Sequence, residues 1–140
     1  MFTVQSLATR PLSVLVVEDN RDGADAMAMF LRYCGHSVRL AYDGCHAIEA
    51  VRARTYDAVL CDIGLPGKSG YEVAKEIRRL CGQRPLLVAL TAYDTPLVRE
   101  TAQAAGFDYF VTKPADPNEV DHLLQEHTGQ LPATGEHEAG

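Results

Sequence analysis

The chain has 140 residues, of which 46% are hydrophobic and 23% are charged. This length suits one domain of about 100 to 150 residues, and the apolar share can fill a core, which excludes disorder for most of the chain. The formal net charge of −6 gives no positive surface for nucleic-acid phosphates or anionic membranes. We therefore expect a compact protein with no direct nucleic-acid partner.

No apolar run approaches the roughly 20 residues of a membrane-spanning helix, and residues 1–12 lack the features of a secretory signal. We therefore expect a cytoplasmic protein that makes no membrane contact. The cysteines form no C-x-x-C pair and lie in apolar or helical contexts, which predicts reduced core thiols rather than disulfides or zinc ligands. These cysteines are Cys34, Cys45, Cys61 and Cys81.

Short apolar segments alternate with stretches of helical period along the chain, and the pair repeats five times. This alternation is typical of an α/β protein whose parallel strands are joined by helical crossovers. The first strand is predicted at residues 13–17, and Gly35 is expected to end the helix that follows it. Residues 37–41 alternate between apolar and polar and are expected at the sheet edge. Asp43 is expected to cap the second helix.

The second half of the chain continues the same pattern. The third strand is predicted at residues 58–61. Residues 86–90 are continuously apolar, as expected for a central strand that is covered on both faces. Thr95, followed by a proline, is expected to cap the next helix, and Gly106 to end it. The fifth strand is predicted at residues 109–112.

The last helix is expected to begin at Asp116, which with Glu119 resembles a capping box. After this helix, residues 128–140 are rich in Gly, Pro and polar residues and show no periodicity, which predicts a disordered tail. The expected organisation is an N-terminal extension at residues 1–12, a single domain at residues 13–127 and this tail.

Polar side chains stand where several predicted strands end. Glu18 and Asp19 follow the first strand, Asp62 the third, Thr91 ends the fourth and Lys113 follows the fifth. In an open α/β sheet, ligands bind outside the carboxyl ends of the strands. We therefore expect these side chains to gather at one rim of the sheet.

Grouped carboxylates repel one another unless a cation neutralises them, and Mg²⁺ prefers oxygen ligands and keeps several waters. Asp19 and Asp62 are the expected carboxylate ligands, and the backbone carbonyl of Gly64 is a candidate third. An acid placed beside Mg²⁺, the Lys113 ammonium and the Thr91 hydroxyl is well placed to act as a nucleophile toward phosphorus.

The motifs VVEDN, CDIGLPGKSG, ALTA and FVTKP occur in that order, at the predicted strand ends. With these motifs, the chain resembles the receiver domain of two-component response regulators over roughly residues 13 to 127. In style it is closest to single-domain receivers and to the receivers of hybrid histidine kinases. The resemblance implies a flavodoxin-like, doubly wound (βα)5 fold with five parallel strands in the order 2-1-3-4-5.

The resemblance also implies a role for each matching residue. Asp62 corresponds to the phosphoacceptor, which takes a phosphoryl group from the phosphohistidine of a histidine kinase or histidine phosphotransfer protein. Asp19 corresponds to a direct Mg²⁺ ligand, and Glu18 to a carboxylate that acts through water. Thr91 corresponds to the hydroxyl that moves toward the phosphoryl group, and Lys113 to the amine that pairs with it.

Phe110 stands where the family carries its switch aromatic, which is more commonly a tyrosine. Phenylalanine lacks the phenol hydroxyl, so the resemblance implies only the movement of the ring. By strand alternation, one of Tyr109 and Phe110 should pack in the core and the other face outward, and a structural role is expected for Tyr109. Gly64 and Tyr93 occupy positions that tune the phosphoryl lifetime in the family, in opposing directions. The peptide bond before Pro114 matches one that is often cis.

Two other functional classes are less well supported by the sequence. Phosphatases of the haloacid dehalogenase type also use an aspartate nucleophile, but their second acid, two residues on, is replaced by Gly64, and the chain has no room for their cap. A flavodoxin-like binder of a nucleotide or flavin needs a phosphate loop where the acidic residues 18–20 stand. Taken alone, Asp62 or Lys113 has an ordinary structural explanation, and only the joint placement favours a site.

A receiver is not an enzyme acting on outside substrates, because it catalyses only its own phosphorylation and dephosphorylation. Phosphorylation shifts the population toward a form whose surface binds a downstream protein partner, which the sequence does not name. No output domain follows residue 127, so we expect a stand-alone receiver or a fragment of a longer protein.

Overall fold

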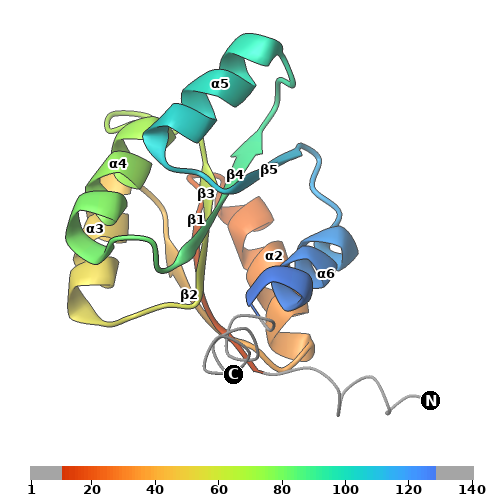
Figure 1. The fold of residues 1–140 in the computed structure, drawn as a ribbon. Coiled ribbons are helices and arrows are strands. Elements are labelled where there is room, and N and C mark those ends of the chain that lie inside the picture. Colours follow the sequence, from red (N-terminus) through yellow and green to blue (C-terminus); the bar gives the residue numbers. More distant parts are fainter. Residues whose placement is uncertain (1–10, 129–140) are drawn as a thin grey trace, which may run out of the picture.

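The computed structural model describes residues 11–128, so most of the predicted extension and nearly all of the predicted tail lie outside it (Figure 1). Strands and helices alternate along the described chain, as the sequence pattern predicts. The elements are β1 (Ser13–Val17), α2 (Arg21–Tyr33), β2 (Ser37–Ala41), α3 (Gly44–Ala53), β3 (Ala58–Asp62), α4 (Gly70–Cys81), β4 (Leu86–Thr91), α5 (Pro96–Ala105), β5 (Tyr109–Thr112) and α6 (Pro117–Thr128). No helix among these residues combines the length and apolarity that a bilayer crossing requires.

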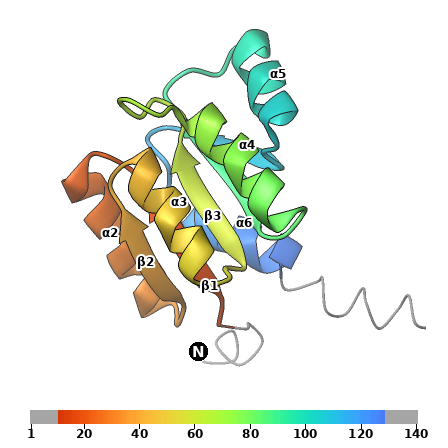
Figure 2. The same ribbon diagram turned by 90° about the vertical axis from the view of Figure 1, so that its left-hand side faces the viewer.

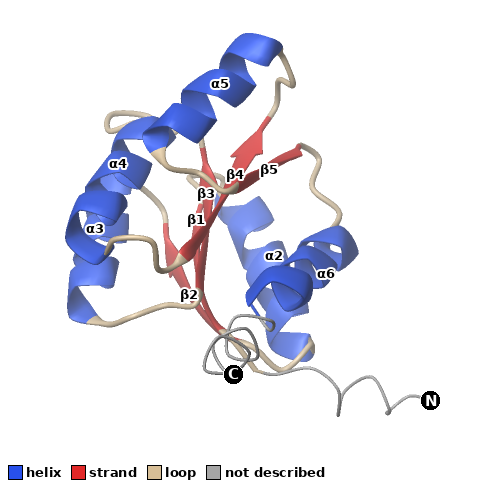
Figure 3. Ribbon diagram, in the orientation of Figure 1, coloured by secondary structure: helices blue, strands red, loops and turns tan. Residues whose placement is uncertain are grey.

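The strands form one parallel sheet of five in the order β2-β1-β3-β4-β5, which confirms the predicted fold class and strand order. Figure 3 shows α3, α4 and α5 on one face of the sheet and α2 with α6 on the other. All five residues of β3 are buried, because this strand lies at the centre and both of its faces are covered. The parallel arrangement brings the carboxyl ends of all strands to one edge.

Two apolar layers fill the spaces between the sheet and its helices. Cys61 lies in one of them, whereas Cys34 is half-buried and Cys45 and Cys81 are exposed. All four thiols are free in the structure. The prediction that all are core thiols was wrong for the two exposed cysteines, because a helical context does not say which face of the helix a residue occupies.

Tyr109 and Phe110 are both half-buried, on opposite faces of β5. The Tyr109 hydroxyl lies 2.8 Å from Nδ1 of His127 in α6, and Phe110 packs under the guanidinium of Arg99, whose central carbon is 3.9 Å from the ring centroid. The expectation that one of the two faces outward was therefore wrong. Helices cover both faces of this edge strand, so alternation moves a side chain from one apolar layer to the other.

The predicted N-terminal caps of α3 and α5 are present. Asp43 accepts a hydrogen bond from the His46 backbone N–H, and Thr95 caps α5, which ends at Gly106 in a left-handed conformation. At the start of α6, Asp116 accepts from the backbone N–H of Asn118. The peptide bond between Lys113 and Pro114 is cis, as the resemblance implied, and so is the bond between Arg84 and Pro85.

The cap of α3 predicts a measurable pH dependence. The Asp43 carboxylate lies 2.8 Å from Nδ1 of His46, and this hydrogen bond raises the pKa of the imidazole above its ordinary value. The backbone N–H of His46, followed by its ring, lowers the pKa of the Asp43 carboxyl. The histidine contribution to stability is present below its unfolded pKa of about 6.5 and is lost as the pH rises through the raised folded value. The aspartate contribution is present above its unfolded pKa and is lost as the pH falls through the lowered folded value.

We expect the NMR titration midpoint of His46 to fall toward the ordinary value in Asp43→Asn, since asparagine keeps the capping oxygen but not the charge. The other histidine resonances of the same sample serve as internal controls. An unchanged midpoint would show that the ion pair does not persist in solution.

Candidate functional site

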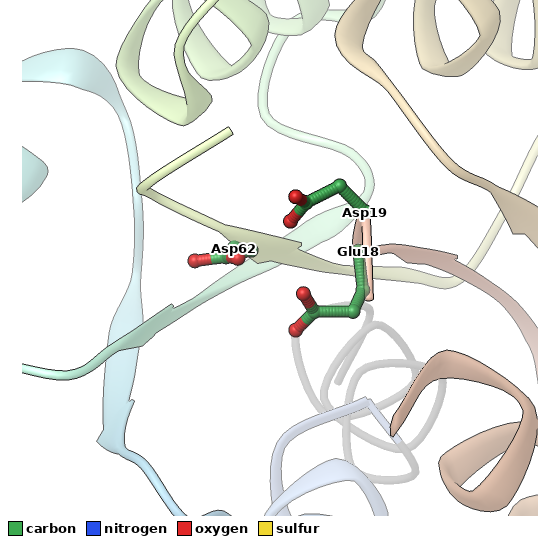
Figure 4. Close-up of side chains that lie close together, drawn as sticks. All are labelled: Glu18, Asp19 and Asp62. Carbon is green, nitrogen blue, oxygen red and sulfur yellow. The ribbon is translucent and has the colours of Figure 1, made fainter. Parts of the chain in front are cut away.

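Three acidic side chains converge at the carboxyl edge of the sheet. Asp62 is the last residue of β3, one position later than the predicted strand end, and Glu18 and Asp19 directly follow β1. Figure 4 shows their carboxylates gathered around one space. One oxygen from each of these carboxylates lies within 4.8 Å of the others. The predicted acidic rim is therefore formed, because neighbouring parallel strands deliver their ends to the same place.

Lys113, which follows β5, joins this group. Its Nζ lies 2.8 Å from Oε1 of Glu18 and 3.0 Å from Oδ2 of Asp62. Glu18 and Asp62 are buried, with 7% and 6% of their surface exposed, whereas Asp19 is exposed. Lys113 therefore bridges the two buried carboxylates of the group. Its contact with Glu18 was not predicted from the sequence.

The ionisation of the group follows from burial and charge. Burial, together with the nearby Asp62, raises the pKa of Glu18 above its ordinary value, against hydrogen bonds from Lys113 and the Asn20 backbone that lower it. Burial lowers the pKa of Lys113, but the hydrogen bonds to Glu18 and Asp62 and the negative charges of these two carboxylates together outweigh this and leave the pKa raised. The amine is thus an ammonium at neutral pH. Three carboxylates with one ammonium carry a formal charge of −2, which a divalent cation would neutralise.

The Asp62 carboxylate is held at both oxygens. Oδ2 accepts from Lys113, and Oδ1 accepts from the backbone N–H of Gly64 at 3.0 Å. The backbone beyond Asp62 is fixed by Ile63, whose N–H donates to the Leu90 carbonyl at 2.9 Å and whose carbonyl accepts from Gly70 at 3.0 Å. This bonding orients the carboxylate toward the rim. The role of the Gly64 carbonyl as a metal ligand stays a prediction.

Thr91 lies buried at the end of β4, next to β3, but its hydroxyl is engaged elsewhere. It donates to the Tyr93 carbonyl at 2.9 Å and accepts from the Tyr93 N–H at 3.0 Å. The Tyr93 side chain is 71% exposed. The structure therefore brings Asp62 and Lys113 into contact, whereas the Thr91 hydroxyl is hydrogen-bonded to the backbone of the loop that follows β4.

The oxygen ligands at this site fit a hard divalent ion. Carboxylate oxygens are the groups that Mg²⁺ selects, and it binds through one or two of them while keeping waters. Glu18, Asp19 and Asp62 offer such oxygens together, and the exposed position of Asp19 leaves one side open to solvent. The residues present are therefore able to hold the ion that the sequence predicts.

Comparison with known proteins identifies the family. Residues 14–125 match the model of the response regulator receiver domain, and the chain belongs to this family. The probable transcriptional regulatory protein TcrX of Mycobacterium tuberculosis is 40% identical over 111 residues, which are 79% of this chain and 47% of TcrX. The chain spans about half the length of the curated relatives it matches, DltR of Streptococcus agalactiae among them at 53%.

Two solved structures show what similar domains bind. The receiver domain of the sensor histidine kinase PA1611 from Pseudomonas aeruginosa has a magnesium ion coordinated in its active site cleft; it is 34% identical, with a TM-score of 0.78, covering 86% of this chain and 99% of that one. The receiver domain of Ssk1 from Saccharomyces cerevisiae was crystallised with the histidine phosphotransfer protein Ypd1; it is 27% identical, with a TM-score of 0.82, covering 88% and 92%.

Gly70, the first residue of α4, is a residue of the site that sequence reasoning missed. A Cβ at this position would lie 2.4 Å from the Asp62 carbonyl oxygen and 2.6 Å from the Ile63 Cα. Backbone atoms cannot yield as a flexible side chain can, so α4 packs this closely on the end of β3 only through glycine. The signal in the sequence was the glycine that follows Lys68-Ser69 in the second motif.

We expect Gly70→Ala to destabilise the protein by about 1–3 kcal/mol, the usual cost of overpacking, and to move the amide resonances of Ile63 and Gly64. Chemical denaturation and NMR measure the two effects. Gly23→Ala is the matched control, because a Cβ there would meet Asn20 Oδ1 at an ordinary 3.5 Å, and this variant should not be destabilised. Equal stability of Gly70→Ala and the wild type would contradict the tight contact.

Proposed function

We propose that this receiver domain is the phosphoacceptor of a two-component phosphorelay, and that it takes a phosphoryl group from a phosphohistidine onto Asp62. The observation that carries the proposal is the position of the Asp62 carboxylate, buried at the end of the central strand, 3.0 Å from an ammonium and grouped with two further acids. Membership of the receiver family supports it. We assign the receiver domain to residues 13–127, between the extension 1–12 and the tail 128–140.

We further propose that Asp19, Asp62 and the Gly64 carbonyl hold Mg²⁺ directly and that Glu18 acts through water. Bound Mg²⁺ would neutralise the oxygens of the incoming phosphoryl group. The magnesium ion in the similar PA1611 receiver and the carboxylates gathered in this chain support the assignment.

The transfer step uses groups that already lie in place. A carboxylate oxygen of Asp62 forms the bond to phosphorus, while the bond between phosphorus and the donor imidazole breaks and its electron pair returns to the imidazole nitrogen, which then takes up a proton. Lys113 and the Gly64 N–H hold the carboxylate in one orientation before the donor arrives. Lys113 is also positioned to pair with a phosphoryl oxygen once the acyl phosphate has formed.

The partners follow from this chemistry. The donor is a histidine kinase or a histidine phosphotransfer protein, and the Ssk1 receiver bound to Ypd1 supports a donor of this kind. The output is a downstream protein partner that remains unknown. The chain acts as a catalyst only for its own phosphorylation and dephosphorylation. We place the protein in the cytoplasm together with these donors.

The proposal predicts a phosphoryl adduct on wild-type protein that is incubated with acetyl phosphate and Mg²⁺. Intact-mass spectrometry should show the adduct only with Mg²⁺, and Asp62→Asn should abolish it, since the amide is not a nucleophile toward phosphorus. Asp116→Asn is the matched control, because Asp116 is exposed and asparagine can still accept the hydrogen bond from Asn118. An adduct of equal size on Asp62→Asn would contradict the proposal.

We propose that Thr91 and Phe110 report the phosphorylation to the surface formed by α5, β5 and α6. In the structure the Thr91 hydroxyl is bound to the Tyr93 backbone, and Phe110 lies half-buried under Arg99. Movement of the hydroxyl toward the phosphoryl group frees space beside β5, and the ring shifts into it. Phosphorylation thus shifts a two-state equilibrium.

We expect Thr91→Ala to accept a phosphoryl group on Asp62 but to lose most of the chemical-shift changes that phosphorylation causes at residues 109–112. The reason is that the methyl side chain cannot bond to the phosphoryl oxygen. Thr101→Ala removes a hydroxyl that bonds to the Leu97 carbonyl within α5, and it should leave those changes intact. If both variants respond like the wild type, Thr91 is not part of the switch.

A further inference from the structure

The outer edge of β2 is surrounded by three arginines. Arg32, Arg39 and Arg54 line one surface hollow of about 440 Å³, together with residues 37, 38 and 40 of the strand. Since β2 is the first strand in the sheet order, no further strand covers this edge in the described part of the chain. Figure 2 shows β2 at the edge of the sheet, between α2 and α3.

No acid of the described chain lies within ion-pair distance of these three guanidiniums. None of them takes part in an ion pair formed by residues 11–128. Other arginines of the same chain do form such pairs, namely Arg52, Arg78, Arg79 and Arg99. In a protein with a net charge of −6, the β2 edge is therefore a local positive surface.

The backbone of β2 offers hydrogen-bonding groups at this edge. The Ser37 N–H donates to the Leu12 carbonyl at 2.8 Å, and the Ala41 carbonyl accepts from Glu18 at 3.1 Å, so alternate residues from 37 to 41 turn their backbone toward β1. Val38 and Leu40 therefore turn theirs outward. The Val38 carbonyl accepts from Nη2 of Arg32 at 2.8 Å, which agrees with this direction.

The arginines flank the edge from both faces of the sheet. Arg39 lies on the same face of β2 as Ala41, because the two are two residues apart, and Ala41 packs in the apolar layer beneath α3. Arg54 directly follows α3 and so belongs to this face as well. Arg32 lies in the last turn of α2, on the opposite face. A strand added at this edge would therefore meet cations on both of its faces.

We propose that the outer edge of β2 binds an extended acidic segment of a partner protein, which adds to the sheet as a further strand. Its backbone would pair with Val38 and Leu40, and one of its N–H groups would take the place of the Arg32 guanidinium at the Val38 carbonyl. Consecutive Asp or Glu residues, which point to opposite faces, would then reach the released Arg32 on one side and Arg39 with Arg54 on the other. The outward N–H and C=O groups suit a peptide strand, whereas a nucleic-acid backbone offers acceptors only. This site is separate from Asp62 and does not depend on its chemistry.

The test uses the full chain and a fluorescein-labelled peptide of about ten residues, twice a typical strand, with paired glutamates separated by Thr and Val. Fluorescence anisotropy should show binding, and the amide resonances of Val38 and Leu40 should move. Arg39→Glu with Arg54→Glu should weaken binding by about tenfold or more, as charge reversal at an interface does. Lys75→Glu, a single charge reversal at an exposed position on α4, should leave the affinity unchanged.

Two altered peptides separate strand addition from charge attraction alone. A peptide with Gln in place of every Glu should bind far more weakly, and so should one that carries N-methyl groups on the alternate residues facing β2. If the Gln peptide or the N-methylated peptide binds as well as the original, or if a single-stranded oligonucleotide binds in place of the peptide, the proposal is overturned. Arg39→Gln with Arg54→Gln, together with thermal unfolding and Asp62 phosphorylation of each variant, distinguishes a lost site from a misfolded protein.

Discussion

The ammonium of Lys113 is the charge on which the site depends. Glu18 and Asp62 are buried at the ends of neighbouring strands, and two buried carboxylates without a cation would take up a proton or destabilise the fold. Lys113 reaches both of them from the end of β5 and thereby links the edge of the sheet to its centre. One ammonium still leaves negative charge, and Asp19 adds to it at the solvent side. The rim is therefore able to attract a divalent cation, and with it a phosphoryl group.

The rest of the fold positions that charge. β3 is buried along its whole length, so Asp62 extends from the buried centre of the sheet. The close contact of Gly70 with its carbonyl and the hydrogen bond from Gly64 fix the direction of the carboxylate. At the far edge of the sheet, no neighbouring strand of the described chain covers β2. Arg32, Arg39 and Arg54 line this edge without forming ion pairs among the described residues, which suits an interaction surface. One sheet thus presents an acidic rim and a basic edge.

Periodicity predicts the strands, the helices and the rim, because parallel strands must bring residues such as Asp62 and Lys113 to one edge. It does not predict side-chain directions. The bond between Lys113 and Glu18 and the engagement of Thr91 with Tyr93 depend on loop conformations that no pattern encodes. Tyr109 faces a second apolar layer, which alternation alone cannot distinguish from solvent. The strand order came from the resemblance rather than from the pattern.

Borohydride trapping of the acyl phosphate tests the central claim most directly. The protein is phosphorylated by a phosphohistidine donor in the presence of Mg²⁺ and then reduced, which converts a phosphorylated aspartate to homoserine. Peptide mapping by mass spectrometry then locates the modified residue. Homoserine at position 62 and nowhere else is the predicted result. Homoserine at another acid, or none in a folded protein that binds Mg²⁺, would contradict the assignment of Asp62 as the phosphoacceptor.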